Sequence, residues 1–307
     1  MLGSFTIESQ VFAERNGGMY GIRPICKMNK LLIVDGSNLL FQMFFGMPAR
    51  IVNSEGKAIQ GTLGFIGALL KIIKMTNPTH IAVLFDGERE NARKNLDGDY
   101  KANRPDYSLI DEESNPFSQL PDVYRALDFL GIKHAEITSH ETDDAIASYV
   151  FTYSNDTKIV ISSFDNDFFQ LISEKVTVLR YRGEKTMICD EKYIAEKFGI
   201  LPSQYADFKS LTGDKADNIK GAEKIGVKTA AKLLNTFETL DNIIKRRDEI
   251  IINSVRESII RNTERLKLNQ KLIRLENVSA LPFSFDELNY SYSGITTNEV
   301  LRGIGIK

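Results

Sequence analysis

The sequence predicts an α/β protein whose central sheet is mostly parallel and sandwiched by helices. Short apolar, β-branched runs alternate with helical periods, aspartates follow where several runs end, and the chain turns helical from about residue 200. Strands that alternate with helices form parallel sheets covered on both faces. The buried strands are expected at 31–34, 81–85 and 158–162, with a weaker one at 176–180.

The part before residue 200 divides into a leader and one domain. Residues 1–27 have no sustained period and no signal-peptide core, so we expect a disordered or dispensable leader. Met28 directly precedes the first strand, and we assign 28–199 to the first domain. Its helices are expected at 61–75, 120–130, 142–152 and 190–198.

Residues 87–119 interrupt the alternation of strands and helices. The stretch is charged, rich in turns and about thirty residues long, which inside a compact domain indicates a functional or a disordered loop. Its basic first half directly follows the strand that ends at Asp86, and this position favours a function.

A second, helical subdomain is expected over 200–307. LTGDKADN leads into a short helix, a glycine-flanked turn from Gly221 to Gly226, and a helix that starts near Lys228. Backbone N–H groups at a helix start can hold a phosphate without reading base sequence. Residues 240–276 add amphipathic helices rich in Lys and Arg, and 280–307 is expected to pack against the rest.

Composition narrows the class of protein. The chain has 307 residues, 42% hydrophobic and 26% charged, and no apolar run long enough to span a bilayer. Two distant cysteines fit no metal spacing and favour a reducing cytoplasm, and three histidines are too few for a zinc design.

The net charge of −2 conceals an uneven distribution of charge. Setting aside the nine acids described below leaves 32 Asp and Glu against 39 Lys and Arg. A basic surface around an acidic metal pocket would suit a DNA-cutting enzyme, whereas a mixed-charge surface without a partner is the plainer alternative.

Nine carboxylates lie in five short clusters, most of them where a predicted strand runs out. A single aspartate there is more often a helix N-cap, but several on one sheet edge would repel one another unless cations neutralise them. An oxygen-lined Mg²⁺ site for phosphate transfer is the economical explanation. The nine are Asp35, Asp86, Glu141, Asp143, Asp144, Asp165, Asp167, Asp214 and Asp217.

Seven ordered motifs closely resemble the bacterial 5′-nuclease family, which includes the 5′→3′ exonuclease domain of DNA polymerase I, its free-standing relatives and the wider flap endonuclease group. The resemblance covers Met28 to about Ile304. It implies a helical arch or clamp at about 87–119 and a C-terminal helix–three-turn–helix that grips duplex DNA. The motifs are VDGSNLLF, VLFDGE, DYKANR, ETDDAIAS, FDNDFFQL, LTGDKADNIKG and IGVKTAAKLL.

The resemblance assigns the acids to two metal groups. Asp35, Asp86, Glu141, Asp143 and Asp144 form one group, and Asp165, Asp167, Asp214 and Asp217 form the other. Two Mg²⁺ ions, for which Mn²⁺ can substitute, would activate the attacking water and stabilise the leaving oxygen. The catalytic set it implies is Asp35, Asp86, Asp143, Asp165 and Lys101.

The DNA contacts also follow from the resemblance. Lys101 would contact the scissile phosphate, although without its motif a solvated loop lysine is the likelier reading. The turn from Gly221 to Thr229 would hold K⁺ and duplex phosphates, the alternative being an ordinary helix start. The expected DNA-binding residues are Arg93, Tyr100, Lys101, Arg104, Gly221, Gly226, Lys228 and Thr229.

Three positions depart from the family pattern. Gln42 stands where an arginine is usual, which removes a guanidinium that could grip substrate. Phe164 stands where a small residue is usual, and it could crowd the sheet end or point into the core. Lys224 stands where a glycine is usual, so a positive φ there would cost about 1 kcal/mol.

The resemblance implies a structure-selective 5′ nuclease that hydrolyses 5′ flaps, 5′ overhangs and nicked or gapped duplexes in primer removal and repair. We expect a cytoplasmic monomer that acts on DNA with a free 5′ end, RNA–DNA primer junctions included. A catalytically inert branched-DNA binding protein and a small RNA-cleaving nuclease are the alternatives. The former would be expected to have lost acids, and the latter lacks the LTGDKADN…IGVKTA element.

Overall fold

The computed structural model describes residues 28–47, 49–87, 92–103, 110–278 and 280–306. The predicted leader at 1–27 and the predicted DNA contact Arg104 lie outside these residues. None of the described helices is long and apolar enough to cross a membrane.

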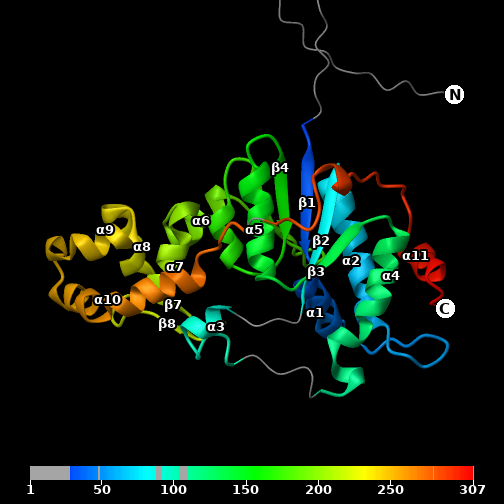
Figure 1. Ribbon diagram of the computed structural model, residues 1–307, viewed down its shortest axis with the longest axis horizontal. Coiled ribbons are helices and arrows are strands. Elements are labelled where there is room, and N and C mark those ends of the chain that lie inside the picture. Colours follow the sequence, from blue (N-terminus) through cyan, green and yellow to red (C-terminus); the bar gives the residue numbers. More distant parts are fainter. Residues whose placement is uncertain (1–27, 48, 88–91, 104–109, 279, 307) are drawn as a thin grey trace, which may run out of the picture.

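A six-stranded sheet forms the centre of the molecule, with strand order β3-β2-β1-β4-β5-β6 (Figure 1). Strands β1 to β5 run parallel and β6 pairs antiparallel with β5, so the prediction of a mostly parallel sheet is confirmed. The strands are β1 Lys30–Asp35, β2 His80–Asp86, β3 Lys133–Ile137, β4 Lys158–Ser162, β5 Val176–Arg180 and β6 Met187–Cys189.

Helices cover both faces of this sheet because its central strands are apolar on both sides. In β1, Leu32 and Val34 face a core shared with one layer of helices, whereas Leu31 and Ile33 face the core beneath α5 and the C-terminal helices. The first layer holds α1 Gly36–Gly46, α2 Gln60–Thr76, α4 Leu120–Phe129 and α11 Thr297–Gly303, and the opposite face carries α5 Thr142–Tyr153.

The C-terminal helices form a second lobe, which lies to the left of the sheet in Figure 1, on the side of β4 and α5. A short antiparallel pair, β7 Gly213–Asp214 and β8 Ile219–Lys220, brackets the turn that carries Asp217. The helices of this lobe are α6 Glu191–Phe198, α7 Tyr205–Thr212, α8 Val227–Phe237, α9 Leu240–Lys245 and α10 Asn253–Ile273.

The predicted arch region is only partly described. It contains the short helix α3 Ala92–Leu96, a turn over 97–103, and the 3-10 helices Glu112–Ser114 and Pro116–Gln119. The α3 segment lies beside β7 and β8 rather than beside the sheet (Figure 1). Arg265 of α10 pairs with Asp97 at 2.7 Å and fixes this turn to the C-terminal lobe.

The segment after α10, described over residues 274–278 and 280–290, returns from the C-terminal lobe across α5 to the sheet. The buried hydroxyl of Tyr149 donates to Phe283 O at 3.0 Å and accepts from Phe283 N at 3.1 Å. Val278 N donates to the Ser148 hydroxyl at 2.7 Å, one residue earlier on the same helix. These bonds satisfy polar groups that burial would otherwise leave without water.

We expect Tyr149→Phe to lower the free energy of unfolding by about 1–3 kcal/mol, because it leaves both backbone groups of Phe283 without their partner. Urea denaturation measures this change. Tyr153→Phe is the control, since that hydroxyl, one turn further along α5, has no hydrogen bond to a described residue. Equal effects of the two substitutions would contradict the prediction.

Candidate active site

The carboxyl ends of the parallel strands bring the first acids together. Asp35 ends β1, Asp86 ends the neighbouring β2, and Asp165 lies in the loop that follows β4 on the other side of β1. Asp143 approaches the same edge from the first turn of α5. Parallel strands all point this way, so the fold itself concentrates negative charge here.

Asp35 has the most restrained carboxylate of this cluster. Its Oδ1 accepts from Asn38 N at 3.0 Å and so caps α1, and its Oδ2 accepts from the Ser163 hydroxyl at 2.8 Å. Asp35 is therefore both the N-cap of α1 and a member of the acidic cluster. Burial raises the pKa of Asp35 to about 7, helped by Asp86 and opposed by the two hydrogen bonds.

Asp143 shows that four of the acids share one electrostatic environment. Burial raises its pKa well above the ordinary value, and the charges of Asp165, Asp35 and Asp86 raise it further, while Lys101 lowers it. Carboxylates placed this way stay ionised together only when a cation joins them.

Three more acids form the second cluster, next to the first. Asp167, Asp214 and Asp217 each offer a carboxylate oxygen, and these oxygens all lie within 4.8 Å of one another. Burial raises the pKa of Asp167 to about 8, and neighbouring Asp165 adds to this rise. Asp165 therefore links the two clusters electrostatically.

Lys209 of α7 lies among these three acids and was missed by sequence reasoning. Its Nζ contacts an oxygen of Asp214 and lies 3.5 Å from Asp167 Oδ1. The pKa of Lys209 is raised, because the attraction of Asp167 and other neighbours outweighs burial. A lysine on the buried face of a helix, five residues before a motif aspartate, is the signal that could have found it.

Two glycines let the turn that carries Asp214 and Asp217 close tightly. Gly213 has a φ of +81°, and a Cβ there would lie 2.4 Å from Gly221 N. A Cβ on Gly221 would lie 2.3 Å from Thr212 C. The fully buried Asn269 of α10 then donates to Ser210 O and Lys220 O, on either side of the turn.

Glu141 and Asp144 face a buried arginine rather than the four-acid cluster. Arg93 contacts Glu141 Oε2 through Nη1, and its Nη2 donates to Asp144 Oδ1 at 2.9 Å and to Arg274 O at 3.1 Å. The pKa of Arg93 is raised, because its two acidic partners outweigh burial. The structure thus places the two acids that were grouped with Asp35 beside a protein cation.

Residues 99–103, the described part of the DYKANR motif, pack directly on the second cluster. Tyr100 is buried, and its hydroxyl and Lys101 Nζ each lie 3.4 Å from Glu141 Oε2. Lys101 N donates to Asp217 O at 3.1 Å from a left-handed conformation with a φ of +54°. A non-glycine residue held there is uncommon and indicates a constrained position between the two clusters.

The predicted DNA-binding turn lies on the surface of the C-terminal lobe. Gly226 and Lys228 are exposed at the start of α8, and Thr229 is half-buried. Lys224, which stands where the family usually has glycine, adopts a positive φ of +65°. Gly221 is enclosed in the neighbouring tight turn instead.

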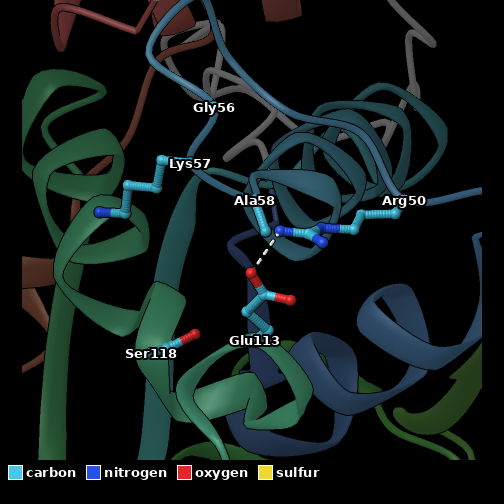
Figure 2. A pocket seen from close by; sticks show the side chains of 6 residues that line it. All are labelled: Arg50, Gly56, Lys57, Ala58, Glu113 and Ser118. Atoms are coloured by element: carbon cyan, nitrogen blue, oxygen red, sulfur yellow. Dashed lines mark hydrogen bonds and ion pairs between the residues drawn. The ribbon is translucent and has the colours of Figure 1, made fainter.

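A separate hollow of about 190 Å³ lies between the α1–α2 connection and residues 113–118 (Figure 2). Arg50 points at Glu113, 2.7 Å away, whereas Lys57 turns toward α4 and pairs with Asp122 at 3.2 Å. Both cations are thus neutralised within the protein, and the hollow holds none of the nine acids.

Two family models match nearly the whole described chain. The 5′-3′ exonuclease N-terminal resolvase-like domain matches residues 30–199, and the 5′-3′ exonuclease C-terminal SAM fold matches residues 200–294. The 5′-3′ exonuclease of Aquifex aeolicus is 31% identical over 263 residues, which is 85% of this chain and 86% of that protein. The thermostable DNA polymerase I of Thermus thermophilus is 32% identical over 84% of this chain, which spans 30% of the polymerase's length.

Solved structures show the same fold. The T5 5′-exonuclease with bound zinc ions superposes with a TM-score of 0.66 at 22% identity, covering 80% of this chain and 90% of that one. The catalytic core of Rad2 in complex with DNA gives a TM-score of 0.55 at 15% identity, with coverage of 91% and 93%. From the two matching family models and the Aquifex relative, the chain belongs to the 5′-3′ exonuclease family.

Proposed function

We propose that this protein is a structure-selective, divalent-metal-dependent 5′ nuclease that cuts 5′ flaps, 5′ overhangs and nicked or gapped duplexes. The observation that carries the proposal is the pair of adjacent acidic clusters, joined through Asp165 and flanked by the basic side chains of Lys101 and Lys209. An inert DNA-binding protein would have no use for so many acids held against their own repulsion.

The donor set fits Mg²⁺, with Mn²⁺ as a substitute. All the donors are carboxylate oxygens, which hard cations prefer, and burial together with mutual repulsion leaves them in need of positive charge. Asp35, Asp86 and Asp143 would hold one ion, and Asp167, Asp214 and Asp217 the other. Asp165, which the resemblance puts in the second group, would serve both, since its charge acts on Asp143 and on Asp167. Glu141 and Asp144, which the resemblance puts in the first group, would reach an ion only on leaving Arg93. When bound, such ions activate water and stabilise the oxygen that leaves phosphorus.

The cations of the protein have distinct roles in this proposal. Lys101 and Lys209 would exchange their carboxylate partners for oxygens of the scissile phosphate as substrate and ions enter. Arg93 is buried, so its predicted contact with DNA requires it to leave Glu141 and Asp144. The ring of Tyr100 would support Lys101, whose Nζ lies 4.9 Å from the centre of that ring.

Grip on duplex DNA is assigned to the C-terminal lobe. The start of α8, with exposed Gly226 and Lys228, would present backbone N–H groups and a charge to phosphates in a helix–three-turn–helix arrangement. K⁺ bound at residues 221–229 would strengthen that contact. The protein would act in the cytoplasm as a monomer, in primer removal and repair.

We expect a 5′-labelled flap duplex to be cut near the flap junction with Mg²⁺ or Mn²⁺ and to stay intact with EDTA. The length of the labelled product on a sequencing gel maps the cut. Uncut flap after long incubation with Mg²⁺ would contradict the proposed activity.

Asp165→Asn should reduce single-turnover cleavage of that flap at least about 100-fold, because it removes the carboxylate common to both clusters. Binding of the flap measured with Ca²⁺ should remain detectable. Asp156→Asn is the matched control, since Asp156 is an exposed acid that precedes β4, at the opposite end of that strand from Asp165. Normal cutting by the Asp165 variant would refute the acid assignment.

Lys101→Met should lower the single-turnover rate by about 100-fold while the Kd for the flap changes little, because the ammonium would act mainly on charge developed in the transition state. Lys57→Met, which alters a lysine of the separate hollow, provides the comparison. A change confined to Kd would make Lys101 an ordinary binding residue.

The acids predict an unusual pH dependence for metal-free protein. Asp35 and Asp167 keep their protons up to about pH 7 and 8 when folded but lose them near pH 3.8 when unfolded. The folded state then holds more protons, so the free energy of unfolding should fall as pH rises from about 4 to about 8, by at least about 1 kcal/mol. Thermal denaturation in EDTA measures this, and Mg²⁺ should reverse the loss at the upper end. Asp35→Asn should flatten the profile, whereas a profile unchanged by that substitution would disprove the cause.

A further inference from the structure

We propose that Arg180 is a positioning residue, which holds the loop 163–166 so that Asp165 can serve both acidic clusters. This inference rests on the proposed metal-dependent function and extends it to a residue outside the acidic motifs. Arg180 is the last residue of β5, which pairs with β4 in the sheet, and its side chain is half-buried.

The guanidinium of Arg180 reaches the loop through two short hydrogen bonds from one nitrogen. Its Nη2 donates to Phe164 O at 2.6 Å and to Asn166 Oδ1 at 2.6 Å. These two acceptors belong to the residues immediately before and after Asp165. The contact therefore fixes the backbone before the acid and the side chain of the residue after it, without touching the carboxylate of Asp165.

Two aromatic rings hold the guanidinium itself. Its centre lies 5.5 Å from the ring centre of Phe164 and 4.9 Å from that of the fully buried Phe169. Planar guanidinium groups gain from such faces, and partial burial strengthens the attraction. Phe164 is thus half-buried at the end of β5 and provides one face of the site that binds Arg180.

The backbone of Arg180 is fixed on both sides as well. Ser163 N donates to Leu179 O at 3.2 Å, which joins the start of the loop to β5. On the other side Arg180 is paired with Met187 in β6. The antiparallel strand β6 therefore gives Arg180 a rigid base from which to hold the loop.

The loop needs this restraint because it holds one carboxylate close to others. Asp165 follows β4 at the same sheet edge where Asp35 and Asp86 end their strands, and these like charges repel one another. Ser163 bridges Asp35 and Asp165 N, and Asn38 Oδ1 accepts from Phe164 N at 3.0 Å. Arg180 adds a restraint that is charged and that also reaches Asn166.

The departure at Gln42 belongs to the same arrangement. Its side-chain amide donates to Tyr181 O at 2.6 Å, at the residue directly after Arg180. In this chain α1 therefore braces the end of β5 through Gln42, and β5 braces the acid loop through Arg180. Residue 42 thus acts here as a support for the sheet end.

The decisive measurement is binding of Mn²⁺ to EDTA-stripped protein without DNA, followed by calorimetry and by the electron paramagnetic resonance signal of free Mn²⁺. Arg180→Met keeps the length and packing of the side chain but removes its donors, and should raise the apparent Kd for Mn²⁺ about tenfold. Arg180→Lys should give a smaller increase, because an ammonium cannot reproduce the planar fork. The matched control is Arg182→Ala, an exposed arginine two residues further on, which should bind Mn²⁺ like the unmodified protein.

Asn166→Ala tests the same contact from the other side. It should raise the Kd for Mn²⁺ only about threefold, because it removes one of the two hydrogen bonds that Arg180 makes with the loop. It decides the matter if Arg180→Met does not fold. An unchanged Kd in the folded Arg180→Met protein, or in Asn166→Ala when the former cannot be made, would overturn the proposal, even if the melting temperature falls. If the unmodified protein neither binds Mn²⁺ nor cuts a flap, the proposed function fails instead.

Discussion

The structure depends on one constraint: a parallel sheet gathers at one edge whatever follows its strands, and here carboxylates follow them. Asp35 and Asp86 end adjacent strands, and Asp165 follows the next one. The edge can be occupied by charge of one sign only if other parts of the chain supply the opposite sign. Much of the architecture outside the sheet serves this need, because buried like charges must otherwise take up protons.

Three basic side chains meet that need from elements distant in sequence. Arg93 of α3 neutralises Glu141 and Asp144, Lys101 of the following turn approaches Glu141, and Lys209 of α7 lies among the second cluster. Arg93 and Lys101 come from residues 92–103, whereas α7 also packs Tyr205, Phe208 and Leu211 into the core beneath the sheet. The acids therefore tie the arch base and α7 to the sheet edge in addition to any apolar contact there.

The sequence allowed the fold class and most central elements to be predicted, because buried parallel strands are near-continuous apolar runs. Two edge strands escaped. In β3, KHAEI has few apolar residues because it is half-exposed at the edge, and β6 has three residues only. The helix α1 shows no clear period, since LLFQMFF is apolar on most sides. The positions of the acids could be predicted for the same reason as the strands, whereas Lys209, Ser163 and Arg180 act through contacts between distant segments, which periodicity does not encode.

The return segment after α10 has a consequence for how the molecule is made. The apolar side of α2 and α4 is completed by Val300 and Ile304 of the α11 region, more than 170 positions further along the chain by numbering. During synthesis the sheet can form early, yet one of its helical layers stays incomplete until that region leaves the ribosome. Contacts of such long separation fold slowly and leave apolar surface exposed meanwhile. Closure of this core is thus coupled to synthesis of the α11 region, and holdase chaperones would find their target on α2 and α4 in the interval.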